Sequence, residues 1–197
     1  MINKPFFFSQ VKLHLFGGSF TQKQVNGLNA ILTEWEAKFS RNDDRFLAYM
    51  LATVHHETDK QMQPIEEYGK GRGKDYGRKL KMGRGPGRRV AYSTPNQLYY
   101  GRGYVQLTWY ENYEKAAKEL KVDCLQHPEL TLDLSIATQI MFAGMTKGWF
   151  TGKKLSDYFN KTKADWVNAR RIINGLDKAQ LIKDYAIKYY AAISYTV

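Results

Sequence analysis

The chain has 197 residues, with 30 Lys or Arg against 19 Asp or Glu, a formal net charge of +11 that indicates an anionic partner. Its single cysteine, Cys124, excludes an intrachain disulfide, and we expect a small buried hydrophobic side chain there. The apolar run at 6–8 is too short for a secretory signal, and no stretch approaches the roughly 18 apolar residues of a membrane span.

The N-terminal third predicts two helices. Residues 21–24 have the Ser/Thr-x-x-Glu/Gln form of a capping box, and apolar residues follow at helical spacing, which predicts a helix over about 22–39. Residues 42–44 then supply a turn and an N-cap. The second helix that follows carries Glu57 near its C-terminal end.

A basic, glycine-rich segment at 69–90 comes next. It holds nine basic residues against the single acid Asp75, a net charge of +8, and seven of the sixteen glycines. We expect a mobile surface loop, extended by like-charge repulsion. Three interpretations are open for this insertion: attraction of polyanions, simple solvation, or nucleic-acid binding of the Gly-Arg-Gly type. A phosphate loop is excluded because Gly-x-x-x-x-Gly-Lys-Ser/Thr is absent.

The rest of the chain also predicts mainly helix. A strand signal appears only in the brief alternation of residues 104–108. The expected helices cover 112–120, a stretch capped by Asp133 that stops at Gly148, 165–173, and 179–193. These elements predict an α or α+β domain with little sheet.

Glu57 is the first candidate for chemistry. Met50, Val54 and Glu57 lie on one helix face, so we expect the carboxyl group on the buried side. Partial burial favours a protonated carboxyl, as a general acid requires. The competing interpretation is an ordinary salt bridge at a helix end. The neighbouring His55 and His56 diverge by about 100°, unlike a zinc-binding pair at i and i+4, so we expect no metal and no cofactor.

Further carboxylates follow directly after Pro64, at Glu66 and Glu67. Glycoside hydrolysis needs two carboxyl groups, one to protonate the leaving oxygen and one to activate water. A helix-borne Glu57 and a loop-borne Glu67 could face each other across a cleft.

The stretch 99–109, Tyr-Tyr-Gly-Arg-Gly-Tyr-Val-Gln-Leu-Thr-Trp, is the other candidate binding element. Its glycines allow close backbone approach, and its aromatic and amide side chains suit sugar faces and N-acetyl groups. Two alternatives are open: a partial match to an RNA-binding motif, and a tightly packed turn before a short strand.

Together these stretches resemble glycoside hydrolase family 19, in its phage-type endolysin branch. The matching segments are His56-Glu57-Thr58, residues 62–69, the Tyr-Tyr-Gly-Arg-Gly signature at 99–108, and Ile-Ile-Asn-Gly at 172–175. The likeness covers about 21–197. It implies a mainly α, lysozyme-like two-lobed fold with a cleft between the lobes and little β-sheet.

The resemblance also implies an inverting mechanism, with the two carboxyls on the order of 6.5–9.5 Å apart. Glu57 would be the acid, Glu67 the base, and Thr108 would hold the attacking water. Glu66 is the alternative second acid; the family pattern favours Glu67, because a basic residue usually precedes the acid. The expected substrate-binding residues are His56, Tyr100, Gln106, Trp109, Asn112 and Asn174.

These features predict one catalytic domain over 1–197 without a separate wall-binding domain. We expect a monomeric endolysin, an N-acetylmuramidase that cleaves peptidoglycan glycan strands; a chitinase is the alternative, and a non-catalytic polyanion-binding or wall-binding module the next. The 69–90 segment could contact the anionic cell envelope. We expect no specific nucleic-acid partner and no membrane span. The absence of a signal suggests storage in a host bacterial cytoplasm until a holin-type pore releases the enzyme.

Overall fold

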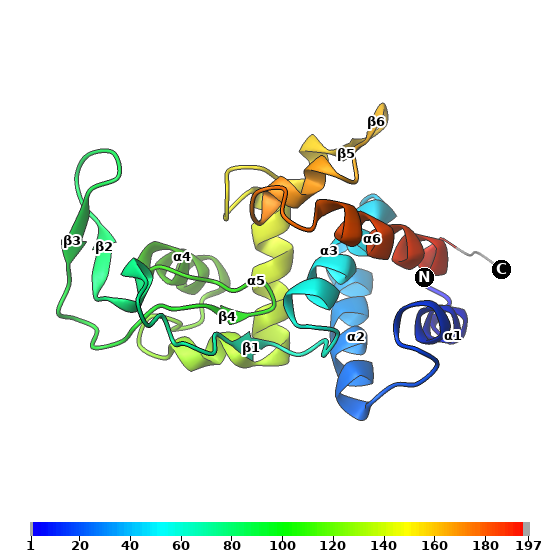
Figure 1. Ribbon diagram of the computed structural model, residues 1–197, viewed down its shortest axis with the longest axis horizontal. Coiled ribbons are helices and arrows are strands. Elements are labelled where there is room, and N and C mark those ends of the chain that lie inside the picture. The colour runs from blue at the N-terminus through cyan, green and yellow to red at the C-terminus, as the bar shows by residue number, and fades with distance from the viewer. Residues whose placement is uncertain (1, 195–197) are drawn as a thin grey trace. The chain divides into compact units, whose positions relative to one another are not determined.

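The computed structural model describes residues 2–194, so residues 1 and 195–197 of the expected domain lie outside the described part (Figure 1). The chain forms two compact units. Unit 1 comprises the described residues up to Gln63 and from Met141 onward, and unit 2 is Pro64–Ile140. Helices dominate, and the strands described between 2 and 194 form only two-stranded sheets. The mainly α fold class with two lobes is therefore confirmed.

Unit 1 is built mainly from helices. Its longest elements are α1 (Lys4–Leu15), α2 (Gln22–Glu34), the π-helical turn η1 (Trp35–Phe39), α3 (Asp44–Glu57) and α6 (Ala179–Ile193). It also contains the C-terminal part of α5 (Leu134–Lys147), which begins in unit 2. Shorter elements complete it: η4 (Leu155–Asp157), β5 (Phe159–Asn160), β6 (Lys163–Ala164) and the 3-10 helix η5 (Asn168–Ile172).

The core of unit 1 lies between α3 and α6, which pack side by side (Figure 1). Every residue of α3 from Leu47 to His55 is buried. α6 contributes Ile182, Ala186 and Tyr189 to the same core, as its helical spacing predicts. Because α3 is enclosed by its neighbours, its last residue, Glu57, is carried on a rigid element.

Local signals set the ends of several helices as the sequence predicts. Thr21 and Gln24 exchange the two hydrogen bonds of a capping box at the start of α2. Asp43 caps α3 by accepting a hydrogen bond from the Arg45 amide. Asp133 accepts from the amides of residues 135 and 136 where α5 begins. These helix starts are confirmed.

Unit 2 has short strands and one regular helix. Strand β1 (Ile65–Glu66) pairs antiparallel with β4 (Arg102–Gly103), which places Glu66 opposite Arg102. Strand β2 (Leu80–Met82) forms a hairpin with β3 (Arg89–Ala91). The other elements are η2 (Asp75–Gly77), α4 (Tyr110–Leu120) and η3 (Pro128–Leu132).

Four expectations about local structure were wrong or incomplete. The helix α1, capped by Asn3, was not predicted, because its Phe6–Phe8 run lacks helical periodicity. The expected strand at 104–108 is a turn that folds Leu107 back onto Arg102. The expected helix at 165–173 is only the short η5. The expected loop at 69–90 contains η2 and the hairpin β2–β3.

Close backbone packing explains part of the glycine content of the 69–90 segment. A Cβ atom added to Gly77 would lie 1.9 Å from the carbonyl oxygen of Gly71. The two chain segments can therefore cross here only because residue 77 is glycine. Glycine here serves close approach as well as flexibility.

Cys124 is buried and unpaired, as expected. Between residues 2 and 194, no helix has the length and apolar character needed to cross a bilayer. The same residues contain no cluster of three His, Cys, Asp or Glu side chains arranged to hold a metal ion.

Candidate active site

Glu57 ends α3 in unit 1 and is mostly buried, with its side chain 18% exposed. Its Oε1 accepts a hydrogen bond of 2.6 Å from an Nη of Arg170, whose own side chain is only 4% exposed. The salt bridge of the plainer interpretation is therefore present. Among the described residues nothing bonds to the other oxygen, Oε2, which leaves that atom available to a substrate.

Arg170 was not identified from the sequence. It lies on η5, and its Nε donates to the carbonyl of Asp177, which fixes the guanidinium beside Glu57. The only feature of the sequence that marks Arg170 is that it is a basic residue just before the apolar Ile172-Ile173 motif. A buried guanidinium next to one carboxylate oxygen stabilises negative charge that develops there.

The histidines before Glu57 differ in their surroundings. His55 is buried, its Nδ1 lies 3.0 Å from the Tyr189 hydroxyl, and burial lowers the pKa of His55 to about 4. The ring is therefore neutral near pH 7 and belongs to the core. The predicted substrate contact His56 is partly exposed. Asn174 is also exposed, and its backbone N–H donates a hydrogen bond to the Arg170 carbonyl.

Glu66 lies on β1 in unit 2 and is surrounded by donors. The Tyr100 hydroxyl donates to its Oε1 at 2.5 Å, and the Lys70 ammonium lies 3.1 Å from Oε2. The Arg102 Nε is 3.6 Å from Oε1. The hydrogen bond from Tyr100, followed by the hydrogen bond from Lys70 and the charges of Lys70 and Arg102, holds the pKa of Glu66 below its ordinary value. This carboxylate is engaged by two cations and a phenol.

Glu67 has a different environment, although it is the next residue. Its Oε1 accepts a hydrogen bond of 2.9 Å from the Tyr76 hydroxyl, and its Oε2 accepts one of 3.2 Å from the Gly101 amide. No ion pair to Glu67 occurs within the described part of the chain. Each carboxylate oxygen keeps a further lone pair, so Glu67 can still accept a proton from water. Of the two carboxylates, Glu67 is therefore the one without a cationic partner among the described residues.

The Tyr-Tyr-Gly-Arg-Gly stretch packs directly against these carboxylates. A Cβ atom on Gly101 would lie 2.5 Å from the Gln106 Oε1 and 3.4 Å from the Glu67 Cβ, so a side chain here would displace the Gln106 amide. Gln106 donates through Nε2 to the Ile65 carbonyl at 3.3 Å. One donor of this predicted substrate-binding amide is therefore used to hold β1 in place.

The predicted water-holding residue, Thr108, is partly buried and lies between two non-glycine residues with positive φ, Gln106 at 50° and Trp109 at 73°. No hydrogen bond to its hydroxyl is formed within residues 2–194. Asn112, another predicted sugar contact, donates to the Thr108 carbonyl at 2.8 Å. A positive φ at a non-glycine residue, as at Gln106 and Trp109, persists only where the surrounding structure enforces it, and it is frequent at functional sites.

The predicted residues thus fall into two groups. Unit 1 carries Glu57, His56 and Asn174; Glu57 contacts Arg170 through its side chain and Asn174 through its backbone. Unit 2 gathers the remaining predicted residues around its paired strands: Glu66, Glu67, Tyr100, Gln106, Thr108, Trp109 and Asn112.

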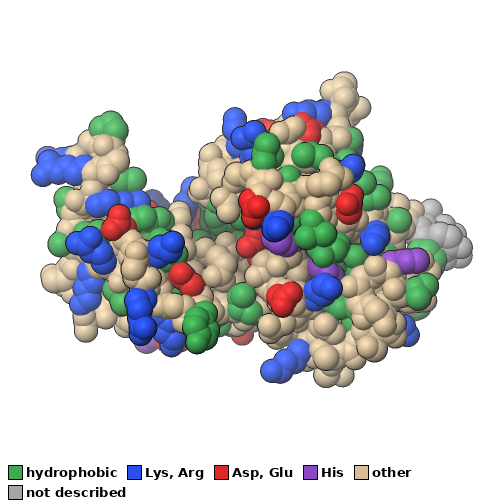
Figure 2. Space-filling model, viewed as in Figure 1, with side chains coloured by type: hydrophobic (Ala, Val, Ile, Leu, Met, Phe, Trp, Pro, Cys, Tyr) green, Lys and Arg blue, Asp and Glu red, His purple; other side chains and the backbone are tan. Residues whose placement is uncertain are grey.

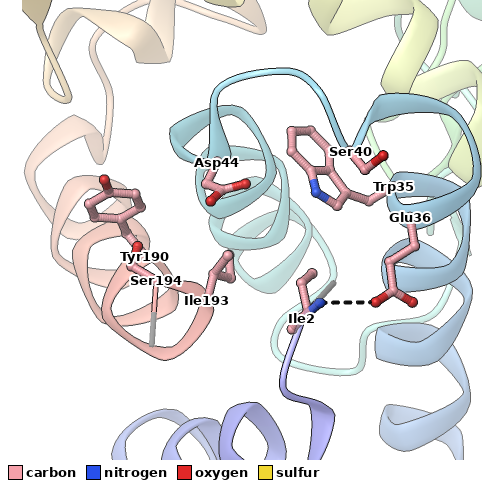
Figure 3. Close-up of a pocket in the computed structure, with 8 residues that line it drawn as sticks. All are labelled: Ile2, Trp35, Glu36, Ser40, Asp44, Tyr190, Ile193 and Ser194. Atoms are coloured by element: carbon pink, nitrogen blue, oxygen red, sulfur yellow. Dashed lines mark hydrogen bonds between the residues drawn. The ribbon is translucent and has the colours of Figure 1, made fainter. Parts of the chain in front are cut away.

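A separate polar pocket of about 260 Å³ opens in unit 1 between α3, η1 and α6 (Figure 3). Its acids are Glu36, which accepts a hydrogen bond from the Ile2 amide and pairs with Lys4, and Asp44. Asp44 begins α3 whereas Glu57 ends it, and thirteen residues at 1.5 Å each separate them by about 20 Å. This pocket is therefore not part of the Glu57 site.

No protein-family model matches the chain. The sequence is similar to an acidic endochitinase from Dioscorea japonica, with 35% identity over 82 residues, 41% of this chain and 31% of that protein. It is also similar to endochitinase CH5B from Phaseolus vulgaris, with 36% identity over 56 residues, 28% of this chain and 16% of that protein. The matched parts span less than a third of these relatives' own length.

The fold is similar to that of solved chitinases over almost the whole chain. Chitinase C from Streptomyces griseus matches with a TM-score of 0.65 and 19% identity, over 99% of this chain and 77% of that one. A bacterial family 19 chitinase matches at 0.59 and 22%, over 99% and 96%. A family 19 class IV chitinase from Zea mays matches at 0.52 and 18%, over 93% and 87%.

The fold is similar to that of the family 19 chitinases, so the fold implied by the resemblance to glycoside hydrolase family 19 is confirmed.

Proposed function

We propose that this protein hydrolyses β-1,4 glycosidic bonds of bacterial peptidoglycan as an endolysin-type N-acetylmuramidase. The family 19 fold supports glycoside hydrolysis of an amino-sugar polymer. The observation that favours an acidic polymer is the +11 charge, most of it in the 69–90 segment. Chitin is close to neutral, so a cationic enzyme gains nothing from its charge on that substrate.

The proposed mechanism is inverting, as the family resemblance implies, and uses Glu57 and Glu67 as its two carboxyls. Glu57 donates a proton to the glycosidic oxygen as the bond from C1 to that oxygen breaks. Glu67 takes a proton from a water molecule, whose oxygen forms the new bond to C1 from the opposite face. Thr108 would hold that water; its hydroxyl forms no hydrogen bond among the described residues, which supports this role.

Arg170 contributes to the proton donation by Glu57. The Glu57 carboxyl becomes negative as it gives up its proton, and the guanidinium at 2.6 Å stabilises that developing charge. The hydrogen bond occupies Oε1 and leaves Oε2 to carry the proton. Arg170 therefore acts on the transition state of the proposed reaction.

A digestion experiment tests the proposed substrate. Purified protein should clear a peptidoglycan suspension, and mass analysis of the products should find N-acetylmuramic acid at each new reducing end. N-acetylglucosamine at those ends would replace the muramidase assignment with a glucosaminidase. Chitin hexasaccharide serves as the comparison substrate, because the similar proteins are chitinases. Faster cleavage of the hexasaccharide than of peptidoglycan would make the protein a chitinase.

We further propose that the cations of the 69–90 segment bind the acidic surface of the cell wall. The segment's cations fall into two sets. Arg89, Lys70 and Arg78 pair with Glu111, Glu66 and Asp75, whereas other members have exposed side chains without a bonding partner in the described chain: Arg72, Lys74, Arg84 and Arg88. Figure 2 shows Lys and Arg side chains gathered over the part of unit 2 around β2 and β3. The unpartnered set is available to polyanions.

Replacing Arg84 and Arg88 with Gln should weaken binding to purified peptidoglycan sacculi roughly thirtyfold at low ionic strength, at about 1 kcal/mol per cation near an acidic surface. Co-sedimentation measures this, and the difference should vanish in high salt. The double variant Lys118→Gln, Lys121→Gln removes the same charge from exposed positions on and just after α4 and should bind more tightly than the hairpin variant. Equal binding by the two would leave the segment a solvated insertion.

Storage in a host cytoplasm until a membrane pore releases the enzyme stays a prediction of the sequence. Its test is expression in a bacterium with and without a pore-forming protein. Lysis without the pore protein would contradict it.

A further inference from the structure

Tyr76 is the only aromatic residue of the 69–90 segment, and it lies outside the motifs that resemble family 19. It lies on η2, and its hydroxyl donates to the Glu67 Oε1 at 2.9 Å. Burial, and then the bond to Glu67, raises the pKa of Tyr76 above its ordinary value. The phenol therefore keeps its proton near neutral pH and remains a donor to the carboxylate.

The backbone around Tyr76 is held by close packing. The residue directly after it, Gly77, crosses Gly71 at a distance that excludes any side chain. The amide of Gly77 also donates to the Lys74 carbonyl at 3.0 Å, which closes the turn that carries Tyr76. The phenol is thus presented from a tight turn.

The ring of Tyr76 is held from the other side by a chain of contacts within unit 2. Its ring meets Trp109 edge-on, with centroids 5.8 Å apart. The Arg89 guanidinium lies 3.6 Å from the centroid of the same indole, and Arg89 pairs with Glu111 at 2.5 Å. The hairpin β2–β3 and helix α4 therefore both support the residue that contacts Glu67.

Two donors consequently fix the two oxygens of Glu67. Gly101 holds Oε2 from the Tyr-Tyr-Gly-Arg-Gly stretch, and Tyr76 holds Oε1 from the basic segment. A carboxylate bonded at both oxygens has its plane fixed, which a general base needs because small misplacements cost large factors in rate.

We propose that Tyr76 is a positioning residue for Glu67, and that the basic segment serves the reaction by carrying it. The inference rests on the proposed function of Glu67 as the base. It assigns the 69–90 segment a role beyond its charge.

The test is the substitution Tyr76→Phe, which removes the hydroxyl and keeps the ring on Trp109. We expect kcat on peptidoglycan to fall about tenfold with KM unchanged, because only the orientation of the base is lost. The acidic limb of the kcat profile should move to higher pH, because the ionised carboxylate has lost a hydrogen bond. Initial rates over a pH series, with chitin hexasaccharide as a second substrate, measure both effects.

The matched control is Tyr68→Phe, the same change on a fully exposed tyrosine that adjoins Glu67. It should keep the parent kcat and pH profile. A Tyr76→Phe enzyme with parent kcat and pH profile overturns the inference, and so does a loss that follows the folded fraction without a change in the profile. Full activity of Glu67→Gln would instead show that Glu67 is not the base. That outcome separates failure of the proposed function from failure of this inference.

Discussion

Replacing Glu57 with Gln should reduce hydrolysis of both peptidoglycan and chitin hexasaccharide by roughly 100- to 10,000-fold, the range of a general acid's contribution. The amide has no proton to give to a leaving glycosidic oxygen. Its shape is retained, and its carbonyl oxygen can still accept the hydrogen bond from Arg170 that now holds the carboxylate at 2.6 Å. The loss should therefore appear in kcat, and the melting temperature should fall as well, because the buried Arg170 loses its anionic partner. Initial rates and a thermal unfolding curve measure the two quantities.

Glu36→Gln is the matched control, because Glu36 is also an ion-paired carboxylate of unit 1, bonded to Lys4 at 2.9 Å. It lies in the pocket near the other end of α3 and should leave the rate unchanged. If Glu57→Gln keeps full activity, Glu57 is only a salt-bridge residue. That outcome would support the plainer interpretation, in which Glu57 forms an ordinary salt bridge at a helix end.

Glu67→Gln and Glu66→Gln should have opposite consequences, although the residues are adjacent. Glu67→Gln should lose roughly 100-fold or more in rate with its stability largely kept, because a base is removed and no ion pair is broken. Glu66→Gln should lower the melting temperature and keep most of the rate. It weakens the ion pairs to Lys70 and Arg102, the latter with its side chain only 7% exposed. Initial rates and thermal unfolding curves of the two variants show which of the two glutamates serves catalysis and which serves stability.

Azide provides a sharper assay for the base. It attacks C1 without losing a proton, so it should restore cleavage in Glu67→Gln and yield a glycosyl azide of inverted configuration. The leaving oxygen still takes its proton from Glu57, so azide should not rescue Glu57→Gln. Rescue of Glu66→Gln in place of Glu67→Gln would assign the base to Glu66.

Elements with local signals were predicted well from the sequence. The start of α2 follows from Thr21 and Gln24, the start of α3 from Asp43, and the bounds of α6 match the helix expected over 179–193. Each depends on a hydrogen bond or an apolar spacing within a few residues, so the sequence contains all the information that is needed. The 69–90 hairpin could not be predicted in this way, because Arg89 is fixed by Glu111, twenty-two residues further on.

The sequence by itself determined that Glu57 ends a helix with a buried face and that two acids follow Pro64. It also placed the glycine-rich signature and, through family resemblance, the fold. Only the tertiary structure distinguished Glu66, which is engaged by cations, from Glu67, which is not. It alone placed Arg170 beside Glu57, 113 residues away along the chain. The physical reason is that a side chain's role depends on the charges within a few ångströms of it, and those come from residues far apart in sequence.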